Sequence, residues 1–156
     1  MRQPEVILVV GRNGVGKTTL ARKLVSRTKN VCVISPSGEW GSWSEDVEGL
    51  VTKALANGTR AIVLDDCDAY LGIEKPTKKG APSPASFWRR LLSTNRHLGV
   101  DVLLLSRRPQ GLPLWAVATA TRIYAFQLGP RETAWLERTY GVTPPEKAHT
   151  AIAISI

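Results

Sequence analysis

The sequence has little cysteine, little histidine and no long apolar run. Its two cysteines, Cys32 and Cys67, lie in or beside apolar, strand-like runs, and its two histidines, His97 and His149, are far apart. This predicts buried free thiols in a reducing compartment and argues against disulfides and against a zinc centre. No apolar run approaches the ~18 residues that cross a bilayer. The apolar run after "MRQPEV" is too short for a signal-peptide core, so we expect no membrane span and a cytoplasmic location.

Acidic residues are also few. The chain has 13 of them against 21 lysines and arginines, which gives a net charge of +8. Such an excess favours an anionic partner, most often nucleic acid. The length of 156 residues is enough for one domain with a real core but hardly for two, so we expect residues 1–156 to form a single domain.

Strand-like runs alternate with helix-like segments along the whole chain. The pattern predicts strands at 6–10, 31–34, 61–64, 100–105, 122–126 and 151–156. It predicts helices at 17–27, 44–56 with Ser44 as N-cap, 86–97 and 132–140. The segment 72–84, rich in Pro, Gly and Lys, is expected to be a flexible basic loop. This βα alternation predicts an α/β fold, a mostly parallel sheet with helices on both faces.

One motif carries clear chemistry. "GRNGVGKTTL" fits the pattern G-x-x-x-x-G-K-[ST] and lies between the first predicted strand and helix. Its glycines let backbone N–H groups turn inward around phosphate oxygens, and the following helix adds its positive end. Lys17 would bridge the β- and γ-phosphates, and Thr18 would offer its hydroxyl to Mg²⁺. We therefore expect ATP to bind at Gly11, Arg12, Asn13, Gly14, Val15, Gly16, Lys17, Thr18 and Thr19.

Two further strand ends supply polar groups. "AIVLDDCD" delivers Asp65, expected to hold Mg²⁺ through water, and Asp66, expected to orient the attacking water. The alternative is a pair of acids that caps a turn. "SRRPQGLP" places Arg107 where a γ-phosphate can be sensed, and the alternative there is a basic surface turn.

The sequence resembles the HerA/FtsK-type motor ATPases. "RHLGVDVLLLSRRPQGLP" is similar to that group's arginine-bearing helix end, sensor strand and following turn, "VCVISPSGEW" to its second strand and "TRIYAFQLGPRETAWLER" to its fifth. The resemblance implies a P-loop fold whose sensor strand lies between the two nucleotide-motif strands. The chain departs from the family pattern at Ser35, where an acid is usual, at Arg107 in place of Gln, and at Asp66 in place of Glu.

The resemblance also implies a function and partners. Members of the group are ring-forming ATPases that pump DNA, and the small viral genome-packaging ATPases are nearest in size. It implies double-stranded DNA, a homo-oligomeric ring and a viral capsid portal or vertex as partners, in the host cytoplasm or the virion. Arg96 matches the arginine that reaches a neighbouring subunit's γ-phosphate; the alternative for it is a solvated helix face or a phosphate contact to DNA. We expect Arg96 at the carboxyl edge of the sheet, where a neighbour's site would open, and Arg89 lies on roughly the same helix face.

Two other functions use the same loop. A small-molecule kinase would need an acceptor pocket and a closing lid, for which 72–84 is a candidate. A GTPase switch is disfavoured because "N-K-x-D" and "D-x-x-G" are both absent.

The basic segment generates a first prediction. Replacing Lys75, Lys78 and Lys79 together by alanine should weaken DNA binding similarly for all sequences, because such lysines grip phosphates without reading bases. The slope of log affinity against log salt should fall by ~0.9 for each phosphate that the segment no longer neutralises, while ATP binding stays intact. An unchanged slope in a salt titration would show that the chain uses its charge elsewhere.

Overall fold

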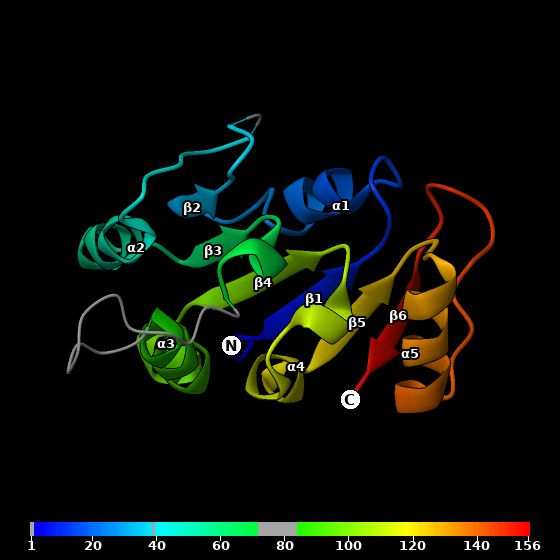
Figure 1. Cartoon of the computed structure of the whole chain (residues 1–156). Coiled ribbons are helices and arrows are strands. Elements are labelled where there is room, and N and C mark those ends of the chain that lie inside the picture. The colour runs from blue at the N-terminus through cyan, green and yellow to red at the C-terminus, as the bar shows by residue number, and fades with distance from the viewer. Residues whose placement is uncertain (1, 39, 72–83) are drawn as a thin grey trace.

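The computed structural model describes residues 2–38, 40–71 and 84–156, and the arrangement of elements is drawn in Figure 1. The sequence-predicted basic loop at 72–84 therefore lies almost entirely outside the described residues. The strands are β1 (Val6–Val10), β2 (Val31–Ile34), β3 (Ala61–Leu64), β4 (Asp101–Ser106), β5 (Arg122–Ala125) and β6 (Ile152–Ser155). The helices are α1 (Lys17–Leu24), α2 (Val47–Ala56), α3 (Pro84–Leu98), α4 (Leu114–Thr119) and α5 (Pro130–Tyr140), with short 3₁₀ turns at Cys67–Ala69 and Pro109–Gly111.

The six strands form one sheet in the order β2-β3-β4-β1-β5-β6. Neighbours from β2 to β5 pair in parallel, and β6 pairs antiparallel to β5. The predicted α/β fold is confirmed, including the position of the fourth strand between the strands that carry the phosphate-loop motif and the paired acids. The carboxyl ends of β1, β3, β4 and β5 consequently meet at one edge of the sheet.

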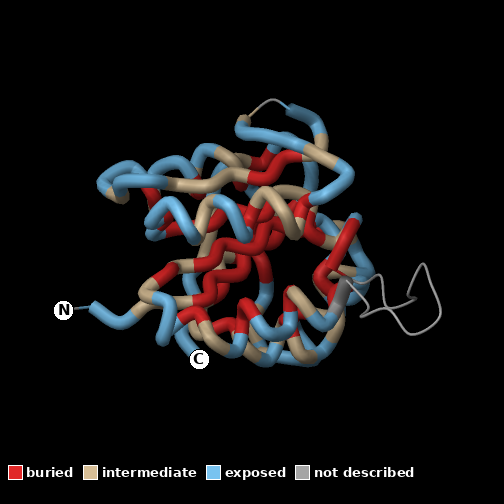
Figure 2. Tube along the Cα trace, turned by 90° about the vertical axis from the view of Figure 1, so that its left-hand side faces the viewer, coloured by how far each residue is buried: buried red, intermediate tan, exposed pale blue. Residues whose placement is uncertain are grey.

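The helices cover the two faces of the sheet unequally. Side chains of α1 pack with alternate residues of β1, such as Ile7 and Val9, in one hydrophobic cluster. Residues of α2, α3, α4 and α5 pack with Leu8 and the other alternate positions in a second cluster. Figure 2 shows the buried strands running through the middle of the molecule. None of the helices in the described segments combines the length and apolar character that a bilayer crossing requires.

Several predicted boundaries are wrong. Helix α1 ends at Leu24 rather than at residue 27, and α4 was not predicted at all. Helix α2 begins at Val47, and its N-cap is Asp46, whose carboxylate accepts the Gly49 N–H at 2.9 Å. The expected cap Ser44 lies two residues earlier and accepts the Asp46 N–H.

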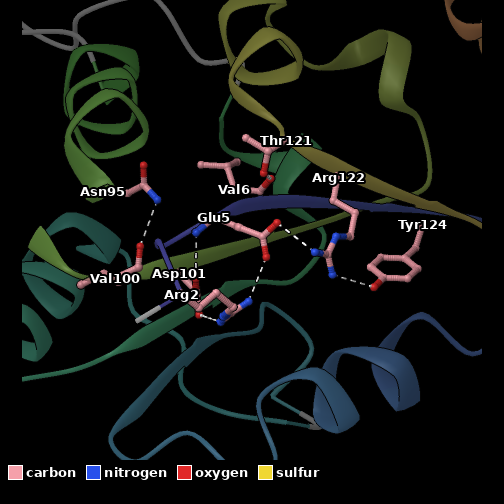
Figure 3. A network of polar contacts seen from close by, with 9 residues as sticks. All are labelled: Arg2, Glu5, Val6, Asn95, Val100, Asp101, Thr121, Arg122 and Tyr124. Atoms are coloured by element: carbon pink, nitrogen blue, oxygen red, sulfur yellow. Dashed lines mark hydrogen bonds and ion pairs between the residues drawn. The ribbon is translucent and has the colours of Figure 1, made fainter. Parts of the chain in front are cut away.

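A polar network holds the amino edge of the sheet, opposite the carboxyl ends of the parallel strands (Figure 3). Glu5, just before β1, forms an ion pair with Arg122 of β5 at 3.1 Å and donates its N–H to Asp101 of β4 at 2.8 Å. Arg2 pairs with both Glu5 and Asp101. These contacts connect the amino ends of three adjacent strands, β4, β1 and β5.

The cap of α2 gives a prediction about stability. Asp46→Ala should lower the free energy of unfolding by about 1 kcal/mol, because the Gly49 N–H loses its acceptor at a helix start. Ser44→Ala, the matched control, should cost less, since its hydroxyl meets a single N–H outside the helix. Urea denaturation of both variants measures the difference, and an equal or larger loss for Ser44→Ala would contradict the assignment of the cap.

Candidate nucleotide-binding site

The loop between β1 and α1 adopts a backbone that its glycines make possible. Gly14 and Gly16 have φ of 74° and 106°, in the region that side chains rarely adopt. Gly11 is needed for space instead, because a Cβ there would lie 2.7 Å from Val15 and 2.8 Å from Phe126. The loop therefore closes tightly just before the first turn of α1, and loops of this shape cradle phosphates with backbone N–H groups and the helix start.

Lys17 lies inside this loop. Its ammonium donates to the carbonyl oxygens of Gly11 at 2.7 Å and Arg12 at 2.8 Å, and the residue is only 8% exposed. Burial lowers the pKa of Lys17, and the neighbouring Asp66 and Asp65 oppose that shift. The loop thus holds a cation at its centre, where a triphosphate would need one.

The paired acids follow β3, two strands from the loop. Asp65 accepts the Asp66 N–H at 3.0 Å, and the Ser35 hydroxyl lies 3.4 Å from its other oxygen. Burial and then the charge of Asp66 raise the pKa of Asp65. Ser35, at the position where the resembled family has an acid, is fully buried and contacts the carboxylate instead of adding a further charge.

An aromatic cluster of Trp43, Tyr70 and Trp88 contacts the carboxyl end of β3. The Tyr70 hydroxyl donates to the Asp65 carbonyl oxygen at 3.1 Å. Its ring packs between Trp43 and Trp88, with centroid distances of 5.7 and 5.8 Å. Trp88 is 2% exposed and Trp43 is 45% exposed, so the stack runs from the core to the surface.

The structure brings the predicted sensor to the second acid. The Arg107 Nε lies 4.0 Å from an Asp66 carboxylate oxygen. Asp66 has φ of 47°, an uncommon conformation for a residue with a side chain. Asp68, in the next turn, accepts a hydrogen bond from Ser106 at 3.2 Å and so ties the β3 end to the β4 end.

A pocket of about 520 Å³ joins the loop to the acids. It is lined by Asn13, Gly14, Gly16, Lys17, Thr18, Thr19, Ser37, Asp65, Asp66 and His149. Val15 is buried beneath the loop, and Arg12 is exposed at its side. A second hollow, of about 410 Å³ beside β2 and α2, has no charged side chain in its lining and does not suit a triphosphate.

Sequence reasoning missed His149. It precedes β6, more than a hundred residues from the loop, and no local motif marks it. Its position follows from the antiparallel pairing of β6 with β5, in which Ile152 lies opposite Ala125 at the carboxyl edge.

Arg96 lies at the amino edge of the sheet, away from this pocket, so the prediction that it lies at the carboxyl edge is wrong. It lines two hollows at the amino edge of the sheet, one with Glu5 and Arg122 and the other with Val6 and Thr119. The reason is that α3 runs back to the start of β4, so its last turn reaches the amino ends of the parallel strands. Arg96 is therefore remote from the phosphate loop of its own chain.

The acids and hydroxyls suit a magnesium ion. Thr18 and Asp65 line the same pocket, and hard oxygen ligands together with phosphates are what Mg²⁺ prefers. Burial, and then the charge of Asp66, raise the pKa of Asp65, and a bound cation would oppose both effects. No cluster of three or more metal-binding side chains occurs in the described part of the chain, so water and phosphate would complete the coordination.

Together these features define the class of protein. A tight glycine loop between a buried strand and a helix, a lysine within it and acids on a neighbouring strand end form a P-loop nucleoside triphosphatase site. Residues 7–123 match the model of the ATPase family associated with various cellular activities (AAA). The chain belongs to that family; it binds ATP and is an ATP-hydrolysing P-loop enzyme. A search of curated proteins finds no match.

Solved structures share the fold. The genome packaging NTPase B204 from Sulfolobus turreted icosahedral virus 2 in complex with sulfate has a TM-score of 0.68 at 17% identity, covering 99% of this chain and 92% of that chain. Its complex with ATP-gammaS has a TM-score of 0.69 at 16% identity, covering 99% of this chain and 93% of that chain. The N-terminal domain of zonular occludens toxin from Neisseria meningitidis has a TM-score of 0.59 at 12% identity, covering 99% of this chain and 94% of that chain.

The site generates a binding prediction. Lys17→Ala should weaken ATP binding by more than about tenfold, because a charged hydrogen bond contributes roughly 1.5–3 kcal/mol. Lys23→Ala is the matched control, since Lys23 is an exposed lysine at the other end of α1. Calorimetric titration with a non-hydrolysable ATP analogue compares the two, and equal affinities would contradict the placement of the phosphates.

Proposed function

We propose that the protein is a Mg²⁺-dependent ATPase that works as an oligomeric translocase of double-stranded DNA, of the genome-packaging type. The observation that supports the proposal is the separation of Arg96 from its own phosphate loop, since an arginine placed there could serve only the site of a neighbouring subunit. The net charge of +8 favours an anionic polymer, and the fold is that of a viral packaging NTPase. The HerA/FtsK resemblance points the same way.

The residues of one chain divide the work of hydrolysis. Lys17 and the loop N–H groups bind and orient the phosphates, and Thr18 and Asp65 would hold Mg²⁺, which neutralises charge on the β- and γ-phosphates when bound. Asp66 aims a water at the γ-phosphorus. The water oxygen forms the new P–O bond as the bond to ADP breaks, and the proton leaves toward the carboxylate. Arg107 lies beside Asp66 and senses whether the γ-phosphate is present.

A second subunit would supply the remaining cation. Arg96 is exposed on the amino edge, and no ion pair or hydrogen bond of its side chain occurs within the described residues. A ring in which this edge meets the next subunit's carboxyl edge brings its guanidinium to that neighbour's γ-phosphate. Such an arginine in trans raises turnover by ~10³–10⁵ in P-loop enzymes. The ring would surround DNA at its centre, and a viral capsid portal or vertex would hold the ring.

The two acids should separate binding from turnover. Asp66→Asn should bind ATP normally but hydrolyse it ~10²–10⁴ times more slowly, because the attacking water loses its base. Asparagine tolerates the positive φ of this position, so the backbone is preserved. Asp65→Asn should instead lose the increase in affinity that Mg²⁺ provides. Parental turnover in Asp66→Asn, measured by phosphate release, would transfer the role to Asp68.

Mixed subunits test the function itself. Arg96→Ala and Lys17→Ala proteins should each be inactive, and an equimolar mixture should regain about a quarter of parental turnover through composite sites. Arg89→Ala, an exposed arginine on the same helix, is the control and should remain active. Double-stranded DNA should stimulate the parental enzyme, which separates a motor from a small-molecule kinase. Equal turnover in dilute monomer and concentrated protein, without a response to DNA, would refute the proposal.

A further inference from the structure

His149 reaches the nucleotide pocket from a part of the chain outside the AAA match. Its Nδ1 lies 3.6 Å from the point where a Cβ on Gly16 would be, so the imidazole faces the last turn of the phosphate loop. The ring of Phe126 approaches the same point to 3.4 Å. His149 itself is exposed, and no hydrogen bond or ion pair engages its imidazole among the described residues.

The pocket has two chemically different ends. Asp65 and Asp66 follow β3, on one side of β1. Burial lowers the pKa of Lys17, and the charges of both acids oppose that larger effect. His149 and Phe126 lie by the ends of β6 and β5, on the other side of β1. The strands β3 and β5 are three places apart in the sheet, which separates the two ends by about 14 Å.

This polarity orients the nucleotide. The γ-phosphate and its metal need the carboxylates and the lysine, so they belong at the β3 end. The sugar and base of the nucleotide must then extend toward the β5 side, where the side chains are an exposed imidazole and a buried phenyl ring. A flat, unpartnered ring at that end is suited to stack on a purine.

We propose that His149 contacts the nucleoside end of bound ATP, with its imidazole against the base. The inference rests on the assignment of the phosphate loop as the ATP site. It adds a group that determines how strongly the enzyme distinguishes a nucleotide from a bare polyphosphate.

The choice of variant follows from the backbone. His149 has φ of 64°, a conformation that asparagine adopts readily and that alanine or phenylalanine does not. His149→Asn therefore removes the ring without straining the turn. His97→Asn is the matched control, because His97 is the other histidine of the chain and lies exposed near the end of α3.

Calorimetric titrations with two probes, a non-hydrolysable ATP analogue and inorganic tripolyphosphate, test the proposal in the 156-residue protein with Mg²⁺. His149→Asn should weaken the analogue by about tenfold, the usual scale for losing an aromatic stack on a base, and leave tripolyphosphate unchanged. His97→Asn should bind both probes normally.

Other results would overturn it. If His149→Asn weakened the binding of both probes equally, the imidazole would be a phosphate ligand. If it changed neither affinity, His149 would not contact the bound nucleotide. Lys17→Ala separates this failure from a larger one, since it should weaken both probes. Parental binding of both probes by Lys17→Ala would refute the phosphate-loop assignment and the histidine proposal with it.

Discussion

The parallel pairing of β1 with β4 on one side and β5 on the other is the constraint from which the site follows. Val10 lies opposite Ser106 in one pair and Ala125 in the other, so three strands end at the same level. A different group follows each strand end: the phosphate loop after β1, Arg107 after β4 and Phe126 after β5. Because strand neighbours are only about 4.8 Å apart, this register brings residues far apart in sequence within reach of one ligand.

Electrostatics at that edge is balanced between burial and opposite charge. Burial disfavours the charge on Lys17 and on Asp65 alike, and each lies close enough to the other to offset part of that cost. Two adjacent carboxylates repel, and the second one, Asp66, lies beside Arg107. The edge therefore suits a polyanion bound together with a cation, because the polyanion would neutralise the lysine and the cation would neutralise the carboxylates.

Local patterns determined how much could be predicted. The strands β1, β2 and β3 begin and end where the sequence predicts, because short β-branched runs are bounded by clear turn residues. The phosphate loop and paired acids are local motifs and fell into one pocket. Helix α4 has too few residues for a periodic signal, and the choice of Asp46 over Ser44 as cap depends on tertiary structure. Arg96 lies at the amino edge because of the direction in which α3 runs, and His149 lies near the phosphate loop because β6 pairs with β5. Neither relation can be seen in a short stretch of sequence.

The stack of Trp43, Tyr70 and Trp88 gives the enzyme an optical reporter of its own. Tyr70 is hydrogen-bonded to the main chain of Asp65, so any shift of that strand end when nucleotide binds moves a ring lodged between two indoles. Trp43 is partly exposed and Trp88 lies in the core, so the two indoles should differ in emission wavelength and in access to quenchers. A rearrangement at Asp65 should therefore change the contribution of Trp43 and Trp88 to the intrinsic fluorescence of the protein, without an added dye.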